Sequence, residues 1–149
     1  QRIAPNICYE DLFGEELAAR FSDPAQAPTV LVNFSNIGWF GNTLAVDQHL
    51  QISRMRALEL ERPMVRATNT GATVIIDHRG VVTHALERFS RGVLRGEVHG
   101  RGLGVSGDAG ITPFAWWASR WGLWPLWLLA GLGVAAGWLG RRRRTHAQA

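Results

Sequence analysis

The first 63 residues alternate short apolar runs with stretches in which apolar residues recur at helical spacing. Residues 4–8 form an apolar run that predicts a strand, and residues 11–21 carry apolar side chains every three or four positions, which predicts a helix. Residues 29–34, "TVLVNF", are apolar and β-branched and predict a buried strand. Residues 47–61 repeat the helical pattern until Pro63 stops it. The expected order is therefore strand, helix, strand, helix.

Three strand-like segments follow, "MVRATN", "ATVIID" and "VVTHAL". Turn residues at 70–71 and 78–80 separate them, which is typical of consecutive antiparallel strands. A further strand is predicted at residues 92–98, "GVLRGEV". Residues 1–98 should thus form a mixed α/β domain with helices packed on a sheet.

Residues 99–119 are expected to be a glycine-rich connector followed by a segment that lies at an interface. Gly102, Gly104 and Gly107 form a G-x-G-x-x-G pattern, yet no helix-forming run opens there, as a dinucleotide site requires. The glycines are therefore interpreted as a flexible linker.

The longest uncharged stretch lies between Arg120 and Arg141. About 20 helical residues span roughly 30 Å of hydrocarbon, so residues 120–140 are predicted to form one transmembrane helix. Tryptophans lie at both ends of this predicted helix, as in the aromatic belts of membrane proteins. Trp138 stands at its C-terminal end, and five cluster toward its N-terminal end: Trp116, Trp117, Trp121, Trp124 and Trp127.

Charge is distributed unevenly along the chain. Four of the 16 basic residues form the run from Arg141 to Arg144, and the other basic residues balance the 12 acidic ones. The positive-inside rule places this tail, residues 141–149, in the cytoplasm and the α/β domain outside it. The arginine run is therefore interpreted as a topology signal. Binding of nucleic acid is excluded, because the chain has no second basic cluster that would support it. All the basic residues are arginine, so the chain contains no lysine for catalysis.

Cys8 is the only cysteine, which excludes an internal disulfide and a cysteine-based zinc site. It stands just before a predicted helix, where the helix N-terminus can stabilise a thiolate nucleophile. A small buried hydrophobic residue would look the same in the sequence. The five histidines show no metal-binding spacing, and no G-x-S-x-G marks a serine hydrolase.

The order of several motifs resembles the second half of a domain of the nitrilase, or carbon-nitrogen hydrolase, superfamily. "PNICYE" matches the strand–turn–helix that carries the family's cysteine, and "NFSNIGWFGNT" matches its Asn/Trp loop. "RALE" at residues 56–59 and the hairpin built on Asn69, Gly71, Asp77 and Gly80 follow in the family order. The resemblance implies the C-terminal half of an αββα sandwich, here followed by one transmembrane helix.

A narrower similarity, through "ICYE", "RMRALELERPMVRATNTG", "GITPFA" and "WPLW", is to the membrane-bound acyltransferases of this superfamily. In these enzymes a cysteine thiolate takes a fatty acyl group from a phospholipid as a thioester. The acyl group then passes to the N-terminal amine of a diacylglyceryl-cysteine lipoprotein. The implied partners are the phospholipid, the lipoprotein and the membrane, and no cofactor or metal takes part.

The resemblance assigns the nucleophile to Cys8. The backbone N–H of Tyr9 is expected to help hold the oxyanion. Glu10 either supports the site or is an acidic residue favoured by the helix dipole.

The loop after the second strand is expected to contact substrate. Trp39 and Phe40 either line the entry for the acyl group or lipoprotein or pack in a core or interface. Asn36 matches the family motif and should fix the loop backbone. Asn69 and Asp77 are expected to hold turns.

The family's catalytic glutamate and lysine lie upstream of its cysteine, and only seven residues precede Cys8 here. We therefore expect this chain to be the C-terminal fragment of a multi-pass protein of the bacterial inner membrane, inactive alone, with its catalytic domain in the periplasm. Two alternatives remain open: a membrane-anchored nitrilase-type amidase, and a non-catalytic, membrane-tethered binding domain with this fold.

Overall fold

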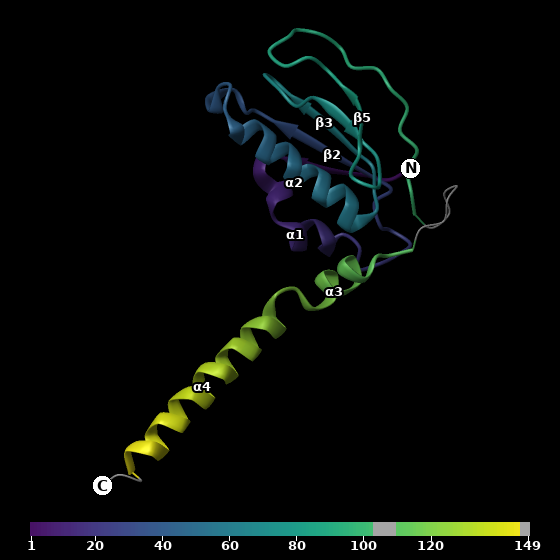
Figure 1. Ribbon diagram of the computed structural model, residues 1–149. Coiled ribbons are helices and arrows are strands. Elements are labelled where there is room, and N and C mark those ends of the chain that lie inside the picture. Colours follow the sequence, from purple (N-terminus) through teal and green to yellow (C-terminus); the bar gives the residue numbers. More distant parts are fainter. Residues whose placement is uncertain (103–109, 147–149) are drawn as a thin grey trace.

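The computed structural model describes residues 1–102 and 110–146 (Figure 1). An α/β domain comes first and two helices follow it. The elements in chain order are β1 Ile3–Ile7, the 3₁₀ helix η1 Cys8–Leu12, α1 Gly14–Ala19, β2 Val30–Ser35, the 3₁₀ helix η2 Gly38–Phe40, α2 Leu44–Leu60, β3 Met64–Thr68, β4 Val74–Ile76, β5 Val82–Ala85, α3 Pro113–Trp121 and α4 Trp124–His146.

The five strands form one mixed sheet in the order β1-β2-β3-β4-β5. The first three strands are parallel because a helix connects each to the next, whereas short turns join β3, β4 and β5 as antiparallel neighbours. The register aligns Asn6 of β1 with Asn33 of β2 and Asn33 with Arg66 of β3. A row of polar residues therefore crosses the parallel strands near their carboxyl ends.

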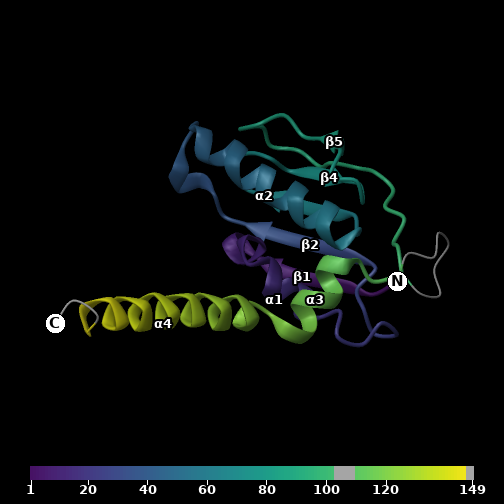
Figure 2. The ribbon, with the colours of Figure 1, turned by 60° about the horizontal axis from the view of Figure 1, so that its bottom comes forward.

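One face of the sheet is covered by helices, and the other is open at β1 and β2, whereas Gly96 packs on the β4–β5 hairpin. Apolar side chains from α1, α2 and α3 share a single core with the inward residues of the strands, among them Leu31 and Met64. Figures 1 and 2 show the helices on this side. On the opposite face Ile7 and its register partner Phe34 are 64% and 53% exposed. Neighbouring exposed apolar side chains of this kind often mark a surface that contacts another part of a protein.

Most expected elements are confirmed, with two corrections. The helix expected at residues 11–21 is divided, because η1 ends at Leu12 and α1 begins only at Gly14. The tight turn of η1 is what carries Asp11 into the interior, where it is fully buried. The helix expected at 47–61 begins earlier, at Leu44.

The strand predicted at residues 92–98 is wrong. This segment forms no strand, and Gly96 instead packs against the side chains of Ile75 and His84, on top of the hairpin rather than beside it. The chain then returns to the start of β2, where the Arg101 N–H donates to the Thr29 carbonyl at 3.0 Å. Part of the glycine-rich connector, residues 103–109, lies outside the described residues.

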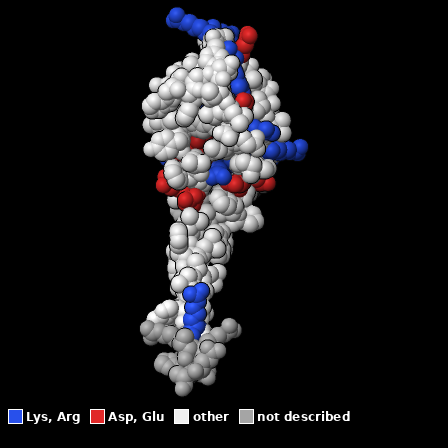
Figure 3. Space-filling model, turned by 60° about the vertical axis from the view of Figure 1, so that its left-hand side comes forward, with Lys and Arg blue, Asp and Glu red and all other residues white. Residues whose placement is uncertain are grey.

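The stretch predicted to cross a membrane is divided between two helices. The backbone breaks at Gly122, which has a φ of +54°, so α3 ends at Trp121 and α4 starts at Trp124. Ala115 and Ala118 of α3 are buried in the core, while α4 extends away from the domain (Figures 1 and 2). The surface of α4 carries no charged side chain before Arg141 (Figure 3).

Within the described residues, neither helix alone has the length and apolar character needed to cross a membrane. Taken together, α3 and the part of α4 up to Trp138 meet those criteria as a pair bent by 70°.

The turn between β4 and β5 depends on a glycine. Gly80 has a φ of +74°, and a Cβ there would lie 2.8 Å from the Arg54 carbonyl oxygen of α2. We expect Gly80→Ala to lower the free energy of unfolding by about 1–3 kcal/mol, because alanine is strained in this conformation and meets rigid backbone. Urea unfolding measures the change. Gly110→Ala is the control, since no atom lies within 4 Å of that position, and equal effects of the two changes would contradict the prediction.

Candidate active site

Cys8 directly follows the carboxyl end of β1 and opens η1. Ligand sites of open α/β sheets commonly lie at this end of the parallel strands. Its backbone has a φ of +54°, a left-handed conformation that is strained for a residue with a side chain. Strain of this kind persists only where surrounding contacts hold it, and it concentrates at functional sites.

Two buried asparagines hold the turn from below. Asn33 Nδ2 donates to the Cys8 carbonyl oxygen at 2.9 Å and to Asn6 Oδ1 at 2.5 Å. The Ser35 hydroxyl donates to Asn33 Oδ1 at 2.6 Å, which fixes the orientation of the Asn33 amide. Asn6 and Asn33 are both almost completely buried. The cysteine turn is thus bonded directly to the neighbouring strand.

A buried ionic cluster centred on Asp11 holds the turn from the side of α2. Asp11 Oδ1 lies 3.0 Å from His49 Nε2, and Asp11 Oδ2 accepts from Ser53 Oγ at 2.5 Å and from Arg66 Nη1 at 3.2 Å. Arg66 Nη1 also donates to the Ser53 hydroxyl. His49 Nε2 lies 3.3 Å from the Cys8 carbonyl oxygen. The cluster therefore connects η1, α2 and β3 beneath Cys8.

Burial lowers the pKa of the Arg66 guanidinium, and the negative charges of Asp11 and of the Cys8 thiolate act in the opposite direction. An arginine keeps its proton in proteins even after such a shift. Arg66 is thus a permanent buried cation below the cysteine turn, and Asp11 is its counter-ion.

A cavity of about 290 Å³ opens beside Cys8. Four of the predicted site residues line it, namely Cys8, Tyr9, Trp39 and Phe40, and His49 joins them from α2. The rings of Trp39 and Phe40 meet edge to face, with centroids 6.4 Å apart. The remaining lining is Leu12, Ala45, Gln48 and Ile52. The cavity therefore combines a thiol with a mostly apolar wall.

The other two predicted site residues do not line the cavity. Glu10 Oε2 accepts from the Ile7 N–H at 2.7 Å and so holds the start of η1. Asn36 Oδ1 accepts from Asn69 Nδ2 at 2.7 Å and from the Gly38 N–H at 3.3 Å, which shapes the loop that carries Trp39.

The predicted turn residues behave as expected. Asn69 Oδ1 accepts from the Ile37 N–H at 3.1 Å, so Asn69 ties its own turn to the loop before Gly38. Asp77 Oδ1 accepts from the N–H groups of Arg79 and Val81, both at 2.9 Å, and thereby closes the β4–β5 turn.

The sequence pattern nominates none of the residues that surround Cys8 from within the core: Asp11, Asn33, His49, Ser53 and Arg66. One signal was present in α2. The buried positions of this helix recur every three or four residues, and two of them are polar rather than apolar: Val46, His49, Ser53, Ala57 and Leu60. Polar residues on a buried stripe must find partners inside, which marks them as members of a network.

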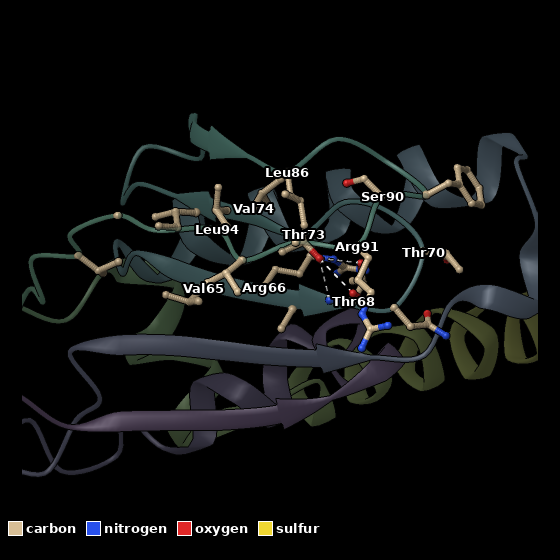
Figure 4. Close-up of a pocket in the computed structure, with 18 residues that line it drawn as sticks. Val65, Arg66, Thr68, Thr70, Thr73, Val74, Leu86, Ser90, Arg91 and Leu94 are labelled. Atoms are coloured by element: carbon tan, nitrogen blue, oxygen red, sulfur yellow. Dashed lines mark hydrogen bonds between the residues drawn. The ribbon is translucent and has the colours of Figure 1, made fainter.

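A larger hollow of about 790 Å³ lies between the β3–β4 hairpin and residues 86–98 (Figure 4). Thr68, Thr73 and Arg91 are among its polar residues, but its lining includes no cysteine, histidine, aspartate or glutamate. The lining therefore offers hydroxyl groups, such as that of Ser90, but no thiol and no imidazole or carboxylate base to activate them. The cavity at Cys8 is the better candidate for chemistry.

Several known proteins that are similar to this chain carry the same name. The chain is 80% identical to an apolipoprotein N-acyltransferase of Verminephrobacter eiseniae over 123 residues, which are 83% of this chain and 23% of that protein. The proteins of the same name from Ralstonia nicotianae and Vibrio vulnificus are 51% and 37% identical over 99% and 97% of the chain, and 26% of each of them is covered. The chain thus spans about a quarter of the length of these curated relatives.

Among solved structures, the NitFhit protein of C. elegans is 23% identical, with a TM-score of 0.47 over 58% of this chain and 22% of that one. The family model named carbon-nitrogen hydrolase matches residues 2–102. This range contains the whole sheet, the cysteine turn and the cluster beneath it. The chain therefore belongs to the carbon-nitrogen hydrolase family, which is the nitrilase superfamily.

Proposed function

We propose that this chain is the nucleophile-bearing part of an apolipoprotein N-acyltransferase. One observation carries the proposal: the only thiol in the chain lies in a strained turn and lines a mostly apolar cavity. The identity of 37–80% to proteins with this name supports the same assignment. A cavity with this wall suits a fatty acyl group better than a charged substrate.

The proposed reaction has two steps that both use the Cys8 sulfur. First, the thiolate attacks the ester carbonyl of a phospholipid, a C–S bond forms, the ester C–O bond breaks, and the leaving alkoxide takes a proton to give a lysophospholipid. Second, the α-amine of a diacylglyceryl-cysteine lipoprotein attacks the thioester. An amide forms, the amine loses a proton and the thiolate is released. Covalent catalysis divides one difficult transfer into two easier ones.

Parts of this machinery lie in the described residues. The Tyr9 N–H is the proposed donor to the oxyanion of both tetrahedral intermediates. Trp39 and Phe40 contact the acyl chain, while Glu10 and Asn36 keep the two loops in shape through their backbone contacts. The resemblance to the family assigns the general base and a lysine to the part of the protein upstream of this chain.

The open face of the sheet fits the same proposal. Ile7 and Phe34 leave apolar surface uncovered, and the curated relatives are about four times as long as this chain. We infer that an upstream segment supplies the second sheet of an αββα sandwich and buries this face. Burial would remove apolar area from water, worth about 25 cal/mol per Å².

The two C-terminal helices are the proposed membrane anchor, in which α4 is the part that leaves the domain and α3 stays attached to the core through Ala115 and Ala118. Together they have the length and composition of a bent span, and the arginines at the end of α4 favour a cytoplasmic tail. The α/β domain would then face the periplasm at the bacterial inner membrane. This position brings the cavity near phospholipids and near lipoproteins that have just crossed the membrane.

The test uses the full-length protein in phospholipid vesicles, with a phospholipid labelled in its acyl chain and a diacylglyceryl-cysteine peptide as acceptor. We expect label to move to the peptide amine in an amide bond. Hydrolysis of small amides without any acyl transfer would support the membrane-anchored amidase. Binding of the peptide without either reaction would support the non-catalytic domain.

A further inference from the structure

We propose that His49 and Asn33 are positioning residues that fix the orientation of the peptide bond between Cys8 and Tyr9. By holding the Cys8 carbonyl toward the core, they turn the Tyr9 N–H toward the cavity as an oxyanion donor. This inference rests on the proposed function, because it assigns these two residues a task in the acylation of Cys8.

The carbonyl of Cys8 is held by two donors from the interior. Asn33 Nδ2 lies 2.9 Å from it and His49 Nε2 lies 3.3 Å from it, and both residues are buried. They come from different elements, β2 and α2, so the oxygen is approached from two directions. The carbonyl therefore has little freedom to rotate.

The direction of the carbonyl determines the direction of the next N–H. In a trans peptide the C=O of one residue and the N–H of the following residue lie in one plane and point in opposite directions within it. The peptide bonds of the described residues are all trans. Because the Cys8 oxygen points into the core, the Tyr9 N–H points outward. Tyr9 itself lines the cavity, and an N–H in the first turn of a helix has no acceptor within that helix.

The two donors are themselves fixed. Both neighbours of His49 Nε2, the Asp11 carboxylate and the Cys8 carbonyl, are acceptors, so this nitrogen carries the hydrogen. Ser53 and Arg66 hold Asp11 in place. On the other side, the Ser35 hydroxyl and Asn6 fix the Asn33 amide with its NH₂ toward Cys8. The cluster beneath the turn thus fixes the two donors that hold the Cys8 carbonyl and, through it, the direction of the Tyr9 N–H.

This arrangement also explains the strained backbone of Cys8. A residue with a side chain leaves the left-handed region when nothing holds it there, and the peptide that follows then rotates. An oxyanion donor is effective only when it is aimed at the position of the developing charge, and loss of one such donor slows acyl transfer by about 10²–10³-fold. Releasing the carbonyl should therefore slow acylation while leaving the thiol in place.

The experiment compares two reactions of the same thiol in the full-length protein. Acylation of Cys8 by labelled phospholipid forms an oxyanion, whereas alkylation by iodoacetamide is a displacement at a saturated carbon and forms none. For His49→Leu we expect acylation to fall by about 10–100-fold, less than the loss of a whole oxyanion donor because Asn33 still holds the carbonyl, and alkylation to change by less than about 3-fold. His49→Gln keeps an N–H donor at the end of the side chain and should restore most of the acylation rate.

Two further variants test the second donor and provide a control. Asn33→Ala removes the other donor and should lower the ratio of acylation to alkylation in the same way. His99→Leu is the matched control, because the side chain of His99 is 89% exposed and lies outside the cluster, so both rates should stay unchanged. A fall of both rates together in His49→Leu, or an unchanged acylation rate, would overturn the inference.

A crystal structure of His49→Leu separates this inference from the proposed function. We expect the Cys8 carbonyl to be rotated away from its present direction, and an unrotated carbonyl contradicts the inference whatever the substrate is. By contrast, a wild-type protein that is alkylated at Cys8 but forms no thioester from phospholipid contradicts the proposed function alone.

Discussion

Replacing Cys8 with alanine should reduce acyl transfer by at least about 10⁴-fold, because removal of a covalent nucleophile leaves only binding and oxyanion stabilisation. No thioester can form without the sulfur, so label from the phospholipid should not accumulate on the protein. The measurement follows hydroxylamine-sensitive label on the full-length protein, together with transfer to the acceptor peptide. Transfer at the wild-type rate by Cys8→Ala would refute the assignment of the nucleophile.

A second variant shows that the loss is chemical rather than structural. Cys8→Gly also lacks the thiol, but glycine adopts a φ of +54° without strain. It should therefore be as inactive as Cys8→Ala and more stable by about 1–2 kcal/mol, the usual cost of a left-handed residue with a side chain. Both variants keep the Cys8 carbonyl and its bonds to Asn33 and His49, so the turn itself should persist.

The largest loss of stability is expected for Asp11→Leu. Asp11 and Arg66 form an ion pair in which both side chains are fully buried. Removal of the carboxylate leaves the guanidinium uncompensated in the core, and Arg66 Nε and Nη2 already lack hydrogen-bond partners there. Breaking a buried pair from one side costs about 3–5 kcal/mol. Pulse proteolysis of the full-length protein in urea measures this change.

A surface ion pair provides the control for Asp11→Leu. Asp47 and Arg88 also form a close contact, but their side chains are 52% and 36% exposed. Water screens and replaces that contact, so Asp47→Leu should change the unfolding midpoint very little. If the two variants unfold at the same urea concentration, the cluster at Asp11 is not the structural centre that its burial indicates.

The elements that could be predicted from the sequence are those whose signal is local. The strands at β1 and β2 and the helix α2 follow from spacing between near neighbours, and the turns at Asn69 and Asp77 follow from residue type. The strand at residues 92–98 was predicted for the same reason and was wrong. Its apolar residues satisfy a strand pattern, but Gly96 packs on the side chains of the hairpin instead of pairing along its edge.

The candidate site likewise has residues that short motifs predict and residues that local patterns do not predict. Cys8, Tyr9, Trp39 and Phe40 were predicted from short motifs and a family resemblance, and the structure brings them to one cavity. The spacing of apolar residues predicts only that Asp11 begins a helix, whereas the structure places it in the buried cluster. Its partners His49, Ser53 and Arg66 stand 38, 42 and 55 positions away, and no spacing rule connects residues so distant.

The order of residues is enough to establish that one thiol stands between a strand and a helical turn, that a long uncharged stretch precedes four arginines, and which family's motifs surround the thiol. How that thiol is held depends on contacts between elements that are distant in the chain. The carbonyl of Cys8 finds its donors on β2 and α2, and the charge beneath it comes from β3. Hydrogen bonds and burial depend on which elements pack together, so they appear only when the sheet and its helices have assembled.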